Sequence, residues 1–157
     1  MSEQKLANQL EALLDEELAA RGRTTAILNE QIQALQDKDL DAFTERSERM
    51  ERELSSNAER GGRRARIVAL LAAQWNIAPT ALTLASIGRR LGDVGERVLA
   101  KREALREAVA EELWANRRLG VLMGAERRLV RDLLRTIYGE DVERSLDGAG
   151  TLVDAEA

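Results

Sequence analysis

Apolar residues recur at spacings of three and four along the first 36 residues of the chain. They are Leu6, Leu10, Leu13, Leu14, Leu18, Ile27, Leu28, Ile32 and Leu35. This spacing places one apolar stripe on a helix, so we expect a first helix over about residues 3–36. Gly22 interrupts the stripe, and a glycine inside a helix costs about 1 kcal/mol relative to alanine.

A second helix is predicted to follow directly. Asp37 and Asp39 offer carboxylate oxygens that can accept from the free N–H groups at a helix start. The residues expected on one face of this helix, counted from Phe43 at alternating spacings of four and three, are Ser47, Met50, Leu54, Asn57, Gly61, Arg64, Val68, Leu71 and Trp75. The stripe is therefore apolar at both ends and polar in the middle. We expect an antiparallel helix that ends near Asn76, since Pro79 disfavours helix before it.

The remaining periodicity predicts a short helix and a long one. Thr80 is a candidate cap for a short third helix through about Leu91. Asp93 and Glu96, three residues apart, resemble a capping box at the start of the last helix. Apolar positions then recur for about 45 residues up to Ile137. Asn116 falls within this apolar stripe, where a buried asparagine would set the register of packing.

Together these elements predict an all-α fold. We expect an elongated antiparallel bundle of three long helices plus one short connecting helix, formed by residues 1–138. Residues 139–157 are acidic and contain Gly148 and Gly150 but few large apolar groups. We expect them to form a flexible, disordered acidic C-terminal tail.

The composition argues against conventional catalysis. The 157 residues include no His and no Cys, which removes the commonest metal ligands and the usual base near neutral pH. Acidic residues such as Asp15, Glu16 and Glu17 are adjacent, so on a helix they diverge by about 100° each. We therefore expect a protein that is not an enzyme and has no catalytic residues, cofactor or metal.

The chain is expected to be cytoplasmic. Its N-terminal residues are polar and charged and contain no apolar segment typical of a signal peptide. The longest uninterrupted apolar run, residues 67–73, falls far short of the roughly 20 residues that cross a bilayer. Insertion into a membrane is therefore not expected.

Charge is distributed unevenly along the sequence. Residues 1–45 carry four basic and ten acidic side chains, whereas residues 46–92 carry nine and four. The segment Arg60–Arg66 holds four arginines and two glycines, a composition that can bind nucleic acid. It contains no aromatic residue for stacking on bases, so a solvated helical stretch is the favoured interpretation.

The end of the last helix combines weakness with apolar character. Gly120 and Gly124 each cost about 1 kcal/mol of helix stability, and residues 129–137 are rich in leucine, valine and isoleucine. Such a segment suits docking onto a partner as an amphipathic helix. Packing against the first two helices is an equally valid interpretation.

The order of these elements resembles the FlgN family of flagellar type III export chaperones. The resemblance covers about residues 5–140 and rests on Leu28–Leu40 at the first hairpin, the Arg-rich second helix ending in Ile67–Leu71, and Thr83–Ile87. It continues through Asn116–Leu119 and Tyr138-Gly139. Two positions depart from the family pattern: Leu113 stands where the family often has a second asparagine, and Gly61-Gly62 is unusual in the second helix.

The resemblance implies a chaperone that binds the C-terminal helical segments of hook-filament junction proteins of the FlgK and FlgL type. By position, the client-binding residues are Leu119, Leu122, Met123, Val130, Leu133, Leu134 and Ile137. Tyr138 would contact the cytosolic part of the flagellar export gate. A generic coiled-coil scaffold or adaptor is the first alternative function, and a nucleic-acid binder that uses Arg60–Arg66 is the second.

Overall fold

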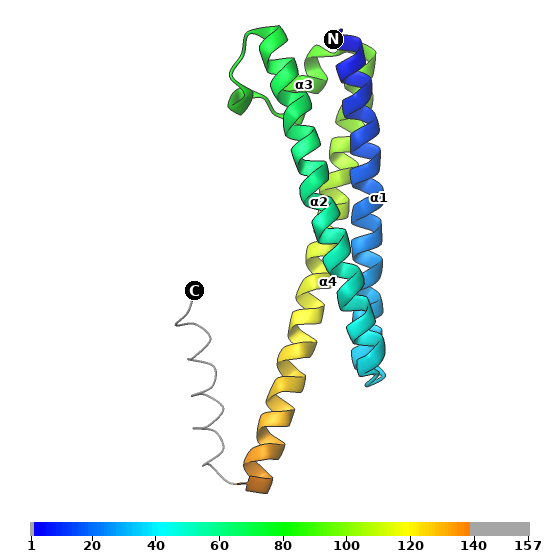
Figure 1. Ribbon diagram of the computed structural model, residues 1–157, viewed down its shortest axis with the longest axis vertical. Helices are drawn as coiled ribbons and strands as arrows, with labels where there is room; N and C mark the ends of the chain where they lie inside the picture. The colour runs from blue at the N-terminus through cyan, green and yellow to red at the C-terminus, as the bar shows by residue number, and fades with distance from the viewer. Residues whose placement is uncertain (1, 139–157) are drawn as a thin grey trace. The chain divides into compact units, whose positions relative to one another are not determined.

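A computed structural model of the chain describes residues 2–138, and the predicted tail, residues 139–157, lies outside them. The described residues are all-α and contain no strand. Their elements in chain order are α1 (Glu3–Gln36), α2 (Leu40–Trp75), the 3-10 turn η1 (Pro79–Ala81), α3 (Leu84–Arg90) and α4 (Gly92–Tyr138) (Figure 1). The predicted all-α class is confirmed.

The chain divides into two compact units, Met1–Arg118 and Leu119–Ala157. Helix α4 passes through the boundary, so its first half belongs to the first unit and its second half to the other. The predicted domain boundary between residues 138 and 139 coincides with the end of the described residues and stays a prediction.

Local capping explains where α1 and α2 begin and end. The Asp39 carboxylate accepts from the Ala42 N–H at 2.9 Å, as expected for a helix start. Lys38 in the turn has a φ of 58°, and Asn76 after α2 has a φ of 53°. Both lie in the left-handed region, which reverses the chain at each point. The hairpin and the end of α2 near Asn76 follow the sequence prediction.

The cap of the short helix is displaced by three residues from the prediction. Thr80 lies within the 3-10 turn that Pro79 opens, and Thr83 caps α3 instead. The Thr83 hydroxyl accepts from the Ser86 N–H at 3.1 Å, and the Ser86 hydroxyl accepts from the Thr83 N–H at 2.9 Å. This reciprocal pair satisfies two backbone donors, which favours Thr83 over Thr80.

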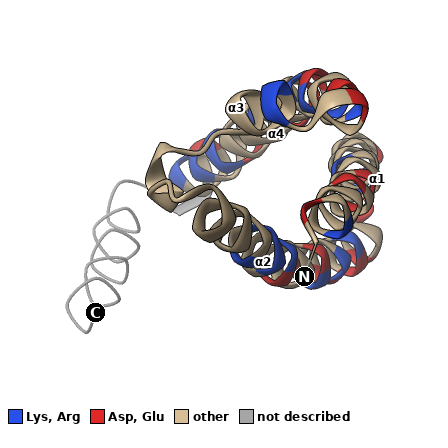
Figure 2. Ribbon diagram, turned by 90° about the horizontal axis from the view of Figure 1, so that it is seen from above, with Lys and Arg blue, Asp and Glu red and all other residues tan. Residues whose placement is uncertain are grey.

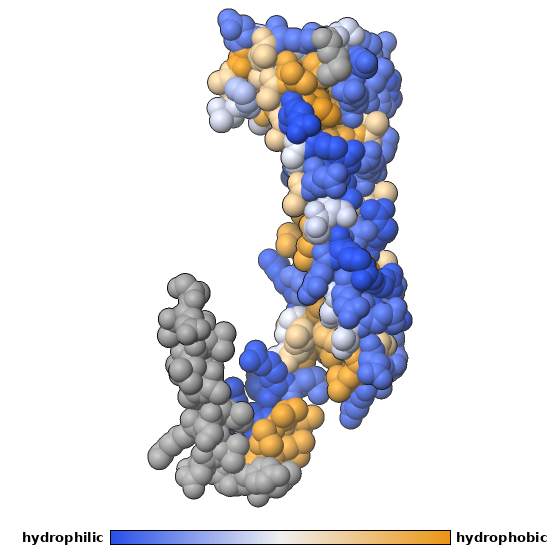
Figure 3. Space-filling model, in the orientation of Figure 1, coloured by the Kyte–Doolittle hydropathy of each residue, from blue (hydrophilic) through white to orange (hydrophobic). Residues whose placement is uncertain are grey.

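The main apolar core lies at the end of the first unit where α3 joins the long helices. The largest fully buried side chains are Leu6, Leu10, Leu14, Leu71, Ile87 and Val98. They come from α1, α2, α3 and α4, and each contributes about 1.5–3 kcal/mol by burial. Figure 3 shows apolar surface near this end as well, whereas the visible side of the α1/α2 hairpin is mainly hydrophilic.

Two glycines allow α3 and α4 to approach closely. A Cβ atom at Gly88 would lie 2.6 Å from Cγ of Leu99, and one at Gly95 would overlap the carbonyl oxygen of Gly88. Because backbone is the obstacle at Gly95, the contact cannot be relieved by turning a side chain. The sharp joint between α3 and α4 therefore requires glycine at this position.

We predict that Gly95→Ala lowers the free energy of unfolding by about 1–3 kcal/mol, as overpacking does in close-packed sites. Gly61→Ala is the matched control, because a Cβ there meets nothing within 4 Å. It should raise stability by up to about 1 kcal/mol through helix propensity. Urea unfolding followed by circular dichroism measures both, and equal effects of the two substitutions would contradict the close contact.

Candidate binding surface on helix α4

The arginines of the basic segment point toward carboxylates within the first unit. Arg63 pairs with Glu16, and Arg64 pairs with Glu17 at 2.5 Å, so both connect α2 to α1. Arg60 is buried and donates to the Asn57 side chain at 2.7 Å. Three of the four guanidinium groups therefore have structural partners in the folded chain.

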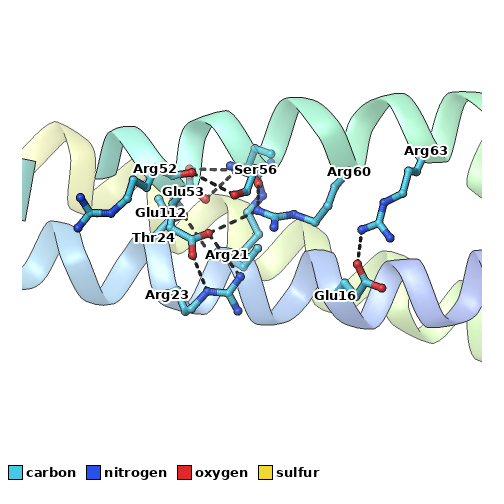
Figure 4. Close-up of polar contacts among 12 residues, drawn as sticks. Glu16, Arg21, Arg23, Thr24, Arg52, Glu53, Ser56, Arg60, Arg63 and Glu112 are labelled. Atoms are coloured by element: carbon cyan, nitrogen blue, oxygen red, sulfur yellow. Dashed lines mark hydrogen bonds and ion pairs between the residues drawn. The ribbon is translucent and has the colours of Figure 1, made fainter. Parts of the chain in front are cut away.

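A polar layer replaces the apolar core midway along the hairpin. The Glu53 carboxylate accepts from Arg23 at 2.7 Å and from Arg60 at 3.4 Å (Figure 4). The pKa of the Glu53 carboxyl is lowered from its ordinary value of 4.5, chiefly because Arg23 donates to it. Gln31 and Ser47 continue this layer with a hydrogen bond of 3.1 Å. Glu53 and Ser47 in the polar middle of the second helix thus find partners on the first helix, whereas Arg60 donates within its own helix.

We predict that the Glu53 carboxylate makes hairpin stability depend on pH. A lowered pKa means that its contribution is present above about pH 4.5 and is lost as the pH falls through the native pKa. Glu53→Gln should reduce stability near neutral pH by about 1–3 kcal/mol and flatten the decline below pH 4.5. Urea unfolding at several pH values measures this. Glu48→Gln, at an exposed position of α2, is the control and should keep the wild-type slope.

The seven predicted client-binding residues lie on α4 but differ in exposure. Leu119 is buried, and Leu122 and Leu134 are half-buried. Met123, Val130 and Leu133 are exposed by 41%, 52% and 53%. The backbone of Ile137 and Tyr138 is helical, whereas their side chains lie outside the described residues.

Further exposed apolar residues of α4 were not included in the prediction. Val121 is 69% exposed and Leu129 is 52% exposed. Leu129 precedes Val130 and lies four residues before Leu133, so the three form one apolar patch at the surface. Figure 3 shows apolar surface at this end of α4. The sequence could have indicated Leu129, because the adjacent apolar residues Leu129 and Val130 widen the apolar stripe of the helix.

Trp114 is a second residue whose placement the sequence did not reveal. It is 61% exposed, and the Arg118 guanidinium lies 4.7 Å from its ring centre, in a cation–π arrangement. Asn116 is also exposed, and Ala115 takes the buried position instead. The prediction of a buried Asn116 was wrong by one residue, because Ala115 and Leu119, four residues apart, form the buried face of α4 here.

The charge around the apolar patch in the second unit is mainly basic. Arg127, Arg128 and Arg131 flank it, together with Glu126 and Asp132. The Arg128 side chain donates to the Gly124 carbonyl at 3.3 Å, which satisfies a backbone acceptor of its own helix. An apolar strip with basic flanks can bind an apolar segment of a partner and favours acidic residues around that segment.

Comparison with known proteins leaves the family open. The chain matches no protein-family model, and no curated protein or solved structure is significantly similar to it. None of the helices within residues 2–138 is both long and apolar enough to span a membrane. The same residues contain no group of three or more carboxylates arranged to hold a metal ion.

Proposed function

We propose that the protein is a non-enzymatic cytoplasmic export chaperone of the FlgN kind. Its clients would be the C-terminal helical segments of hook-filament junction proteins, held on the second half of α4 before secretion. The observation that supports this most directly is the exposed apolar patch of Leu129, Val130 and Leu133 on a single helix. Large exposed apolar patches mark binding sites more often than they serve the free protein.

The arrangement of the helices and the C-terminal tail is part of the same proposal. A chaperone of this kind would be an elongated antiparallel bundle of three long helices with a disordered acidic tail over residues 139–157. The described helices and the α1/α2 hairpin are consistent with such a bundle. Tyr138 would deliver the loaded chaperone to the cytosolic part of the export gate.

We predict that Val130→Asp and Leu133→Asp each weaken binding of the junction-protein segments by at least about tenfold, because a carboxylate would be buried against an apolar client. Both positions are more than half exposed, so the fold should persist. Leu40→Asp is the control, since Leu40 is 71% exposed at the start of α2. Titration calorimetry with segments from the same organism measures the affinities.

The same experiment separates the chaperone from the scaffold. Light scattering on the free protein reports whether Val130 and Leu133 form a seam between copies. If the chain is a dimer that these substitutions dissociate, and neither segment binds at tens of micromolar, the scaffold alternative replaces the chaperone. A monomer that co-elutes with a segment supports the chaperone.

We predict that Tyr138→Ala reduces secretion of the junction proteins but leaves their affinity for the chaperone within about twofold. The reason is that the proposed gate contact is separate from client binding. Secretion is measured as junction protein in the culture medium, with Thr136→Ala as a neighbouring control. Loss of client affinity in Tyr138→Ala would instead place Tyr138 in the client surface.

A further inference from the structure

The first unit contains a groove of about 710 Å³ that is lined by all four helices. Its apolar wall is formed by Leu84 of α3 and by Leu105, Val109 and Leu113 of α4. The three α4 residues are spaced four apart and extend for about 12 Å along the helix axis. This makes the apolar wall an elongated strip rather than a closed pocket for a small molecule.

The strip is covered at one end and open at the other: Leu84 and Leu105 pack against the core of the first unit, whereas Val109 and Leu113 are exposed. Ion pairs that join Arg97 to Glu11 and Glu112 to Arg21 identify the side of α4 that faces α1. Ala115 is buried next to Glu112 along the same face, whereas Leu113 is 53% exposed. At this level of α4 a small side chain thus occupies the helix contact, while the larger Leu113 lines the open groove.

The charged lining of the groove is predominantly basic. Arg21, Arg64, Arg102 and Arg106 line it, with Glu17 as the one lining carboxylate. Arg106 is the most accessible of the four, with a side chain that is 67% exposed. Its guanidinium group lies 3.4 Å from a carboxylate oxygen of Glu103. Even with Glu103 and Glu112 counted, basic groups outnumber acidic ones.

The geometry points to this groove as a docking site for an amphipathic helix of a partner protein whose apolar face is flanked by Asp or Glu. Aliphatic side chains spaced four apart on α4 present ridges of the kind that a second helix packs against. Three of the lining arginines pair with Glu112, Glu17 and Glu103 of the same chain. The accessible Arg106 and the small basic excess supply charge complementarity to acidic flanks. Figure 2 shows α2 and α4 on different sides of the bundle, with Lys and Arg distributed along both.

The residues that line the groove indicate which kind of molecule it binds. Single-stranded nucleic acid binds basic grooves through stacking on aromatic residues, and the lining residues include none. A second copy of α4 is a poor match, because its exposed end around Arg127, Arg128 and Arg131 is itself basic. The inference is independent of the proposed chaperone function, since the groove lies in the first unit and the client patch in the second.

The test uses the full-length protein and a fluorescein-labelled synthetic helix of about 18 residues, roughly five turns. The probe carries leucines on one face and glutamates on both flanks, and a second probe has lysines in place of the glutamates. We expect fluorescence anisotropy to show binding of the glutamate probe, at least about tenfold weaker binding of the lysine probe, and weakening by salt.

Two substitutions in the groove and two matched controls locate the site. Leu113→Asp and Arg106→Glu should each weaken the glutamate probe by about tenfold or more. Leu40→Asp, exposed at the start of α2, and Arg117→Glu, exposed on α4 outside the groove, should leave affinity unchanged. Failure of this pattern leaves the chaperone proposal intact, because the junction-protein segments are tested separately through Val130 and Leu133.

Several results would overturn the inference. One is the absence of binding at about 100 µM, which corresponds to a binding free energy weaker than about −5.5 kcal/mol. Another is binding of the glutamate probe to Leu113→Asp with the same affinity as to the wild type. A third is tighter binding of the lysine probe than of the glutamate probe. Displacement of the glutamate probe by an oligonucleotide would assign the groove to nucleic acid. A dimer that Leu113→Asp dissociates would assign it to a second copy, and tighter binding of a peptide of residues 139–157 would assign it to the chain itself.

Discussion

The first unit depends on one apolar core at the end where α3 meets the long helices. Ile87 is fully buried there among leucines of α1 and α2, and α3 itself has only seven residues. A helix this short is unstable alone in water, so its packing maintains it. The close approach of Gly88 and Gly95 then fixes the direction in which α4 leaves the core. The placement of the first half of α4, which lines the groove, follows from this joint.

Away from the core, polar contacts take over the pairing of helices. Arg63 and Arg64 of α2 pair with Glu16 and Glu17 of α1, the same separation of 47 residues in both cases. Exposed ion pairs contribute little energy individually, but several between α1 and α2, including Glu30–Arg49, together favour the observed register of the hairpin. The acidic first helix and basic second helix seen in the sequence are therefore complementary within one molecule. The ion pairs between α1 and α2 therefore explain the uneven distribution of charge along the sequence without a bound nucleic acid.

The sequence predicted the helices well because their ends are determined locally. Asp39 and Asn76 act on neighbouring backbone groups, and both ends lie where expected. Thr80 failed as a cap because Pro79 began a 3-10 turn before the helix. The candidate surface was predicted less completely: Met123, Val130 and Leu133 are exposed, but Leu119 is buried. Exposure depends on which face of α4 the rest of the chain covers, and periodicity alone does not report that.

Some apolar residues of α4 are buried in the fold, whereas others of similar or larger size are exposed. A helix that only closed a bundle would direct its larger apolar side chains inward, because each buried leucine contributes about 1.5–3 kcal/mol. In α4 the buried positions near the unit boundary are Ala115 and Leu119, while Leu113 and Trp114 are more than half exposed. Exposed apolar groups of this size reduce solubility and give nothing to the free fold in return. Contacts with another molecule, as proposed for both surfaces of α4, would account for these exposed apolar groups.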